Sequence, residues 1–151
     1  MYRSIVVGTD GSPSAQEAVR RAGELAALCG ARLAIVSAYR PVAHAAVLAM
    51  SGAAGGLLLD PAELVEQQRQ EADEALEHAM MMLDATAPFA STVSAPGNPA
   101  EVLLAIAADK DADLIVVGNR GMQGAARFLL GSVPNRVAHH ASCSVLIVQT
   151  I

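Results

Sequence analysis

A glycine-rich segment at residues 118–132 carries the residue types of this chain that are best suited to chemistry. It follows the apolar run 113–117 and has a Gly-x2-Gly-x9-Gly-Ser spacing, formed by Gly118, Gly121, Gly131 and Ser132. A glycine-rich turn after a strand presents bare backbone N–H groups, and the N-terminus of a following helix attracts anions. The spacing matches neither the Gly-x-Gly-x-x-Gly of dinucleotide-binding folds nor a Walker A loop, since the chain has no Gly-Lys-Ser/Thr. The segment therefore predicts a phosphate site.

The side chains around this segment each allow two interpretations. Ser132 is expected to cap the last helix and to donate its hydroxyl to a phosphate, because an N-cap lies where the helix dipole favours negative charge. Arg120 and Arg127 could cover a phosphate or simply lie on the surface. Asp10, just past the first expected strand, could hydrogen-bond its own turn or hold a Mg²⁺ that bridges phosphates. Any single glycine could serve only a positive φ or close helix packing, but three of them followed by a hydroxyl favour phosphate binding.

No convincing catalytic set accompanies the predicted phosphate site. A nucleophile elbow is missing, and the only lysine, Lys110, precedes the fourth expected strand, at the wrong end of the sheet. A fast kinase or ATPase is therefore not expected, and slow ATP hydrolysis stays a weaker option. His139 and His140 are neighbours on a helix and point about 100° apart, which disfavours a shared metal. Cys29 and Cys143 match no metal or redox spacing and are expected to be buried thiols of a reduced protein.

The composition excludes several classes of protein. The chain has 151 residues, of which 53% are hydrophobic and 17% charged, so a single folded domain is expected over residues 1–151. The net charge of −5 and the 3% of aromatic residues argue against a nucleic-acid binder. No apolar stretch reaches the roughly 18 residues of a membrane span, and no signal peptide is visible, so we expect a cytoplasmic protein.

Short apolar runs alternate with amphipathic segments along the whole chain. Strands are expected at 4–8, 32–38, 89–95, 113–117 and 144–149, and helices at 13–29, 61–85, from 99 onward and at 133–141. Ser12 and Asn98 are expected helix N-caps, the latter in a capping box with Glu101, and Gly30 ends the first helix. Residues 41–60 have no period and are expected to form a mobile loop. The alternation predicts a Rossmann-like, doubly wound α/β domain with a parallel sheet and helices on both faces.

Ligands of such sheets bind beyond the carboxyl ends of the strands, where the winding direction reverses. Two loops of suitable chemistry leave those ends, at residues 8–13 and 118–132. If the first and fourth strands are neighbours, both loops open onto one crevice.

Several motifs together resemble the nucleotide-binding branch of the universal stress protein family. They are Val7–Ser12, Gly97–Glu101, the glycine spacing through Leu129–Pro134, and the final apolar run Val145–Val148. The resemblance extends from about residue 3 to residue 150. It implies a five-stranded sheet of order 3-2-1-4-5, a homodimer formed through the last strand at 144–149, and a role in stress adaptation without fast turnover.

The resemblance also implies a ligand, which in this branch is typically ATP with Mg²⁺. Adenine is then expected near Ala38 and the metal near Asp10. The implied nucleotide-binding residues are Gly8, Thr9, Asp10, Ala38, Val117, Gly118, Asn119, Arg120, Gly121, Gly131, Ser132 and Val133. Segments 37–39 and 131–135 are similar to members that bind cyclic AMP, which leaves a cyclic AMP sensor or buffer open. A dimeric interaction scaffold without ligand is the third alternative.

Overall fold

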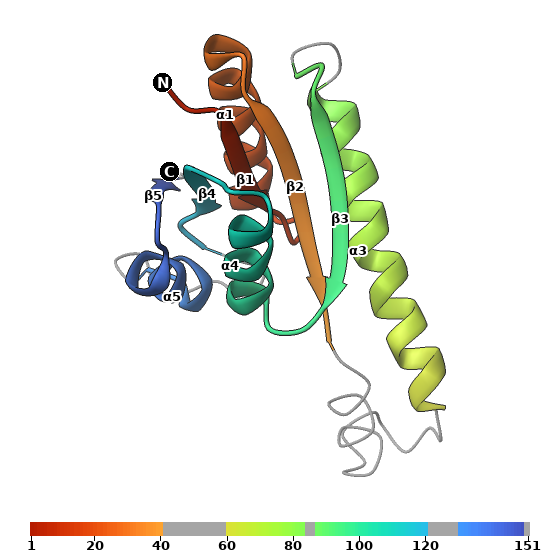
Figure 1. Cartoon of the computed structure of the whole chain (residues 1–151). Coiled ribbons are helices and arrows are strands. Elements are labelled where there is room, and N and C mark those ends of the chain that lie inside the picture. Colours follow the sequence, from red (N-terminus) through yellow and green to blue (C-terminus); the bar gives the residue numbers. More distant parts are fainter. Residues whose placement is uncertain (41–59, 84–86, 121–129, 150–151) are drawn as a thin grey trace.

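A five-stranded parallel sheet forms the centre of the computed structural model, which describes residues 1–40, 60–83, 87–120 and 130–149 (Figure 1). The strands are β1 (Ser4–Gly8), β2 (Arg32–Tyr39), β3 (Ala90–Pro96), β4 (Leu114–Gly118) and β5 (Ser144–Val148). The helices are α1 (Pro13–Cys29), α3 (Pro61–Leu83), α4 (Pro99–Asp109) and α5 (Ser132–His140). The strand order β3-β2-β1-β4-β5 confirms the expected topology. Because β1 pairs with both β2 and β4, the loops after β1 and β4 leave the same edge of the sheet side by side.

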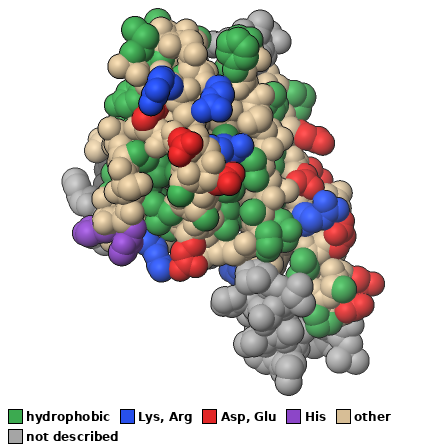
Figure 2. Space-filling view, viewed as in Figure 1, with side chains coloured by type: hydrophobic (Ala, Val, Ile, Leu, Met, Phe, Trp, Pro, Cys, Tyr) green, Lys and Arg blue, Asp and Glu red, His purple; other side chains and the backbone are tan. Residues whose placement is uncertain are grey.

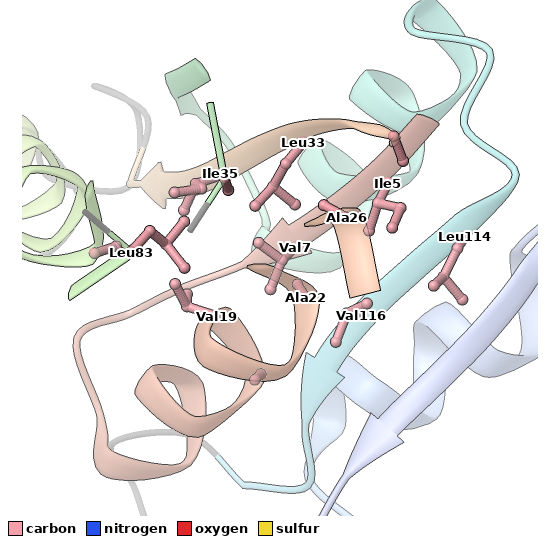
Figure 3. Close-up of a cluster of buried hydrophobic side chains, with 14 of the residues drawn as sticks. Ile5, Val7, Val19, Ala22, Ala26, Leu33, Ile35, Leu83, Leu114 and Val116 are labelled. Atoms are coloured by element: carbon pink, nitrogen blue, oxygen red, sulfur yellow. The ribbon is translucent and has the colours of Figure 1, made fainter. Parts of the chain in front are cut away.

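Both faces of the sheet are covered, as the alternating pattern of the strands requires. Helices α1 and α3 pack on one face, and α4 and α5 on the other (Figure 1). In β1 and β2 the odd-numbered residues, such as Ile5, Val7 and Ile35, meet α1 and α3 in one core, which Leu114 and Val116 of β4 also join (Figure 3). The even-numbered residues of these two strands, such as Val6 and Val36, meet α4 and α5 in a second core together with Ile115 and Val117 of β4. Successive side chains of a strand therefore enter two separate cores. A shift of one residue would move every side chain to the opposite face, so the register of the central strands is fixed.

Helix starts agree with the sequence at α1 and α4, whereas α5 begins one residue earlier than expected, at Ser132. The hydroxyl of Ser12 accepts the N–H of Ala15, and Gly30 ends α1 in the left-handed conformation. Asn98 caps α4 as expected, by accepting from the N–H groups of Ala100 and Glu101. The carboxylate of Glu101, however, binds Arg136 instead of reaching back to complete the capping box.

Six of the fifteen acidic residues of the chain lie on α3, whose outer face lies along one side of the molecule (Figure 2). Their carboxylates are exposed, and Arg69 pairs with Glu66 and Asp73 at (i, i+3) and (i, i+4) spacing. This is therefore a solvated helix face. In the described part of the chain no helix is long and apolar enough to cross a membrane.

Asp113 ties the start of β4 to the start of β1. Its carboxylate accepts N–H bonds from Arg3 at 2.9 Å and from Ser4 at 3.1 Å. Burial by itself would raise the pKa of Asp113, but the N–H donors of Ser4 and Arg3 outweigh it and hold the pKa below its usual value. The ionised form is therefore favoured by folding.

Asp113→Asn should destabilise the fold by about 1 kcal/mol near neutral pH, because an amide cannot accept both backbone donors as a carboxylate does. The contribution of Asp113 is present in full above the unfolded pKa of about 4 and is lost as the pH falls through the lower folded pKa. Urea unfolding at neutral and acidic pH measures this, with the exposed Asp109→Asn as a control. The same destabilisation in both variants would contradict the assignment.

Candidate functional site

A cleft of about 610 Å³ opens at the carboxyl ends of β1, β2 and β4. It lies where the strand order reverses between β1 and β4, which is the usual ligand position in doubly wound sheets. Ten of the expected site residues line it: Gly8, Thr9, Asp10, Ala38, Val117, Gly118, Arg120, Gly131, Ser132 and Val133. Gly121 and Arg127 lie outside the described residues. The fold thus brings together residues that are more than 100 positions apart.

The loop after β1 is held by its own hydrogen bonds. The N–H of Thr9 donates to the carbonyl of Val36 at 2.8 Å, so this group is already used within the fold. A carboxylate oxygen of Asp10 accepts the N–H of Ser12 at 3.0 Å. Of the two interpretations of Asp10, the turn-forming one is observed, and the exposed carboxylate also lines the cleft.

Asp10 is the only carboxylate that lines the cleft among the described residues. These residues also contain no group of three His, Cys, Asp or Glu side chains able to hold a metal ion. Mg²⁺ is commonly bound by one or two carboxylates together with substrate phosphates and water. The donor set at Asp10 therefore fits a Mg²⁺ that arrives with a phosphate-bearing ligand, and does not fit an independent metal centre.

The loop after β4 is fastened to α1 by Ser14, a residue that the sequence analysis did not identify. The buried hydroxyl of Ser14 donates to the side-chain oxygen of Asn119 at 3.0 Å and accepts the N–H of Arg120 at 3.3 Å. A Cβ atom on Gly118 would lie 2.4 Å from that hydroxyl and 2.8 Å from the Ser14 backbone. Gly118 thus serves close helix packing, one of the two roles considered for the glycines.

Asn119 does not line the cleft but joins three elements behind it. Besides its bond from Ser14, its N–H donates to the carbonyl of Val148 in β5 at 2.9 Å. Its own carbonyl accepts the N–H of Gly131 at 3.0 Å, at the start of α5. Asn119 is therefore a positioning residue of the cleft wall.

The N-terminus of α5 points into the cleft without a side-chain cap. The expected cap, Ser132, is wrong: Gly131 occupies the N-cap position with φ −59° and ψ 161°, and Ser132 is the first helical residue. Glycine is an acceptable N-cap, but it has no oxygen to accept the first N–H groups of the helix. Those of Ser132 and Val133 have no acceptor within the helix, whereas α1 and α4 are capped by Ser12 and Asn98. The start of α5 is thus the uncapped one of these three and attracts an anion.

Cationic residues line the same cleft as the uncapped start of α5. Arg40, Arg120 and Arg136 all line the cleft. Of these three arginines, only Arg120 was a candidate from the sequence. Arg40 directly follows β2, and Arg136 lies about one helical turn after Ser132. Both positions could have been identified once the strand order was known. The guanidinium of Arg136 donates to the carboxylate of Glu101 at 2.6 Å. In a protein of net charge −5, these three arginines give the cleft a local concentration of positive charge.

The opposite wall of the cleft is apolar. It is formed by Val36, Ala38 and Tyr39 at the end of β2 and by Leu103 on α4. The carbonyl of Tyr39 accepts the N–H of Gly97 at 2.8 Å, which holds the ends of β2 and β3 together. One end of the cleft therefore offers donors and positive charge, and the other offers a surface for a flat apolar group.

Other candidate residues lie away from the cleft. Lys110 ends α4 and borders a smaller hollow at the amino ends of the strands. The ring of His139 contacts the carbonyl oxygen of Asn135 one turn back at 2.8 Å, as expected for a histidine interacting with its own helix. Cys29 and Cys143 are half-buried instead of fully buried, and burial raises the pKa of the Cys143 thiol.

Known proteins of similar sequence and structure cover nearly the whole chain. The model of the Universal stress protein family matches residues 1–149. Universal stress protein Rv1636 of Mycobacterium tuberculosis is 36% identical over 149 residues, which span 99% of this chain and 97% of that protein. Universal stress protein YxiE of Bacillus subtilis is 33% identical over 153 residues, spanning 99% of this chain and 100% of that protein. The crystal structure of a universal stress protein in complex with cAMP is 35% identical, covers 99% of both chains and superimposes with a TM-score of 0.74.

Proposed function

Because this chain belongs to the universal stress protein family, we propose that its cleft binds an adenine nucleotide and that the protein regulates a stress response without fast turnover. The observation that carries the proposal is the uncapped N-terminus of α5, which opens into a cleft lined by three arginines. Backbone N–H groups and a helix dipole aimed at one point are suited to phosphate oxygens.

The phosphate position in this proposal is the start of α5. The N–H groups of Ser132 and Val133 and the Ser132 hydroxyl supply donors there, and Arg120 supplies charge from the loop after β4. Val117, Gly118 and Gly121 are proposed to border the same phosphates. The adenine ring is proposed to lie against the apolar wall formed by the end of β2, near Ala38.

ATP with Mg²⁺ is the nucleotide that we propose first. Three arginines can balance a polyphosphate, and the exposed Asp10 carboxylate fits a phosphate-bound Mg²⁺. When bound, the metal would supply charge neutralisation between adjacent phosphates. The chain's own part is to orient the nucleotide through α5 and the loops after β1 and β4.

Cyclic AMP is the second candidate, favoured by the relative of 35% identity whose structure contains cAMP. A cyclic monophosphate carries one negative charge and requires no metal. The use of an Asp10 oxygen within its own turn is compatible with this ligand.

A regulatory role fits the placement of the remaining groups. Lys110, the only lysine of the sequence, lies at the far end of the sheet and cannot assist phosphoryl transfer in the cleft. Slow hydrolysis stays a weaker alternative. We also propose a homodimer through β5, which among the described strands is an edge strand paired only with β4 and which exposes Leu146.

Thermal unfolding of nucleotide-stripped protein tests the proposal, with ATP, ADP, AMP, cyclic AMP and adenosine in separate samples, each with Mg²⁺ and with EDTA. A ligand at a hundred times its Kd adds about 2.7 kcal/mol, which should raise the Tm by about 5–10 °C. A Mg²⁺-dependent shift that is largest for ATP supports the first candidate. A larger, EDTA-resistant shift with cyclic AMP supports the second. No shift with any nucleotide would overturn the proposal in favour of a ligand-free scaffold.

Asp10→Asn sharpens the choice between the two nucleotides. Asparagine keeps an oxygen that can accept the N–H of Ser12, so the turn is preserved while the charge is removed. ATP binding should then lose its Mg²⁺ dependence, whereas cyclic AMP binding should stay unchanged.

A further inference from the structure

Arg136 and Glu101 form an ion pair at the edge of the cleft that joins the middle of α5 to the first turn of α4. The Nη2 of Arg136 on α5 lies 2.6 Å from Oε1 of Glu101 on α4, and the residues are 35 positions apart. Arg136 lines the cleft, and the two side chains are 50% and 60% exposed. The pair therefore stands next to the proposed phosphate position, within reach of a ligand and of solvent ions.

The carboxylate of Glu101 lies in the first turn of α4 and is favoured by the dipole of that helix. Arg136 lies in the middle of α5, where the helix dipole has little effect on its charge. A phosphate at the start of α5 would lie about one helical turn from the backbone of Arg136. This phosphate would offer the guanidinium a second anionic partner. The carboxylate of Glu101 would compete with the phosphate for Arg136 and would also repel the phosphate.

We infer that Arg136 contacts the phosphate of the ligand and that Glu101 is a specificity-determining residue that opposes ligands in proportion to their negative charge. This inference rests on the proposed nucleotide-binding function. Without ligand, the guanidinium of Arg136 is paired with the carboxylate of Glu101. With ligand, the guanidinium binds the phosphate instead, and the negative charge of Glu101 remains close to that phosphate. Glu101 thus penalises a triphosphate more than a monophosphate or a cyclic monophosphate, and does not affect adenosine.

Isothermal titration of Glu101→Gln with ATP, AMP and adenosine at low salt tests the inference. Exposed ion pairs contribute modestly, so ATP should bind about two- to fivefold more tightly than to the wild type. AMP should gain less and adenosine nothing. The gain should vanish in about 1 M salt, which screens exposed charges over a few ångströms. A purely structural role of Glu101 would change all three ligands alike and would not respond to salt.

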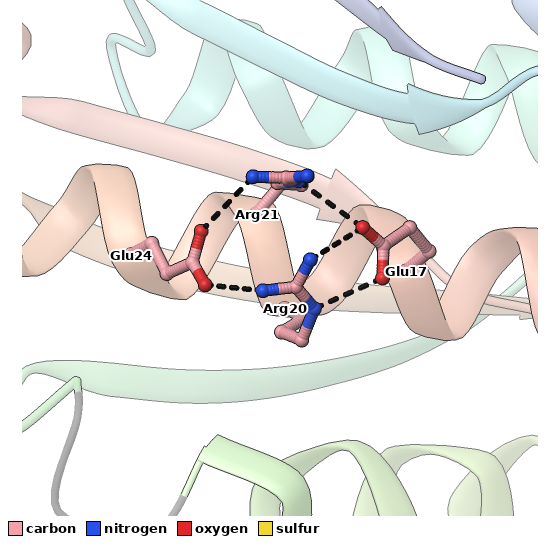
Figure 4. Close-up of polar contacts among 4 residues, drawn as sticks. All are labelled: Glu17, Arg20, Arg21 and Glu24. Carbon is pink, nitrogen blue, oxygen red and sulfur yellow. Dashed lines mark hydrogen bonds and ion pairs between the residues drawn. The ribbon is translucent and has the colours of Figure 1, made fainter. Parts of the chain in front are cut away.

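Glu24→Gln is the matched control. Glu24 forms ion pairs with Arg20 and Arg21 on the outer face of α1, within the four-residue network of Figure 4. It is a similarly exposed carboxylate away from the cleft, and its replacement should leave all three affinities unchanged. Arg136→Gln should weaken ATP binding and should reduce the further gain from Glu101→Gln.

The outcomes separate this inference from the function on which it rests. If the wild type binds no nucleotide, the proposed function fails. If the wild type binds ATP but Glu101→Gln binds it equally or more weakly at low salt, the role of Glu101 is overturned and the function stands. Circular dichroism melting of each variant shows whether it is folded at the titration temperature.

Discussion

Replacing Gly131 by aspartate should weaken nucleotide binding strongly while leaving the fold intact. Aspartate is a favoured N-cap, and Gly131 has the extended φ and ψ that such a cap requires. Its carboxylate would accept the N–H of Val133, since Pro134 has none, and would place a negative charge where we propose the phosphate. We expect a loss of affinity of about a hundredfold, because like charges close together in a partly buried site repel strongly.

The stability of this variant should stay within about 0.5 kcal/mol of the wild type. The gain from the cap is offset by the new Cβ, which would lie 3.3 Å from the carbonyl oxygen of Asn119. Gly131→Asn is the matched control, because it has nearly the same shape and no charge. Titration calorimetry and urea unfolding measure both properties. Equal losses of affinity in the Asp and Asn variants would show that shape and not charge is responsible, against the proposed phosphate position.

Gly118→Ala should damage both binding and stability. Its Cβ would come within 2.8 Å of the backbone carbon and oxygen of Ser14, atoms that no rotamer change can move. Either α1 or the loop after β4 must shift, and overpacking of this kind costs about 1–3 kcal/mol. The shift would also break the bonds of Ser14 to Asn119 and Arg120, so we expect nucleotide affinity to fall about tenfold.

Two further variants test the cause of the effect of Gly118→Ala. Adding Ser14→Gly should not restore binding, because the obstructing backbone atoms remain. Gly30→Ala should cost about 1 kcal/mol from its left-handed backbone at φ 64° without changing affinity, since nothing lies within 4 Å of the new Cβ. Wild-type affinity in Gly118→Ala would refute the packing role.

The sequence predicted the elements of the fold well because each has a local cause. The central strands are continuous apolar runs, and α1 has both of its ends marked, by Ser12 and Gly30. The order of the strands was instead implied by the family resemblance, and the sheet confirms it. Local pattern and family together placed ten of the expected site residues around one cleft.

What the sequence did not predict depends on contacts between distant segments. Ser14 follows a proline at the start of a helix and looks like an ordinary first-turn residue, yet its hydroxyl binds residues 105 and 106 positions away. Glu101 has the position of a capping-box residue, but a guanidinium from α5 is the stronger partner for its carboxylate. The cap of α5 was misplaced by one residue because glycine and serine, adjacent at positions 131 and 132, are both acceptable N-caps.

The bonds of Asn119 have a thermodynamic consequence for assembly. One residue holds the start of α5 through its carbonyl and the last residue of β5 through its N–H, so the cleft wall and the edge strand are both bonded to the backbone of a single residue. Subunits that associate through β5 would therefore meet next to the group that fixes the ligand's helix. Linkage is reciprocal: a ligand that strengthens the association by some factor is held more tightly by the associated form by that same factor. A rise in nucleotide concentration would then favour the associated form, and a rise in subunit concentration would favour nucleotide binding.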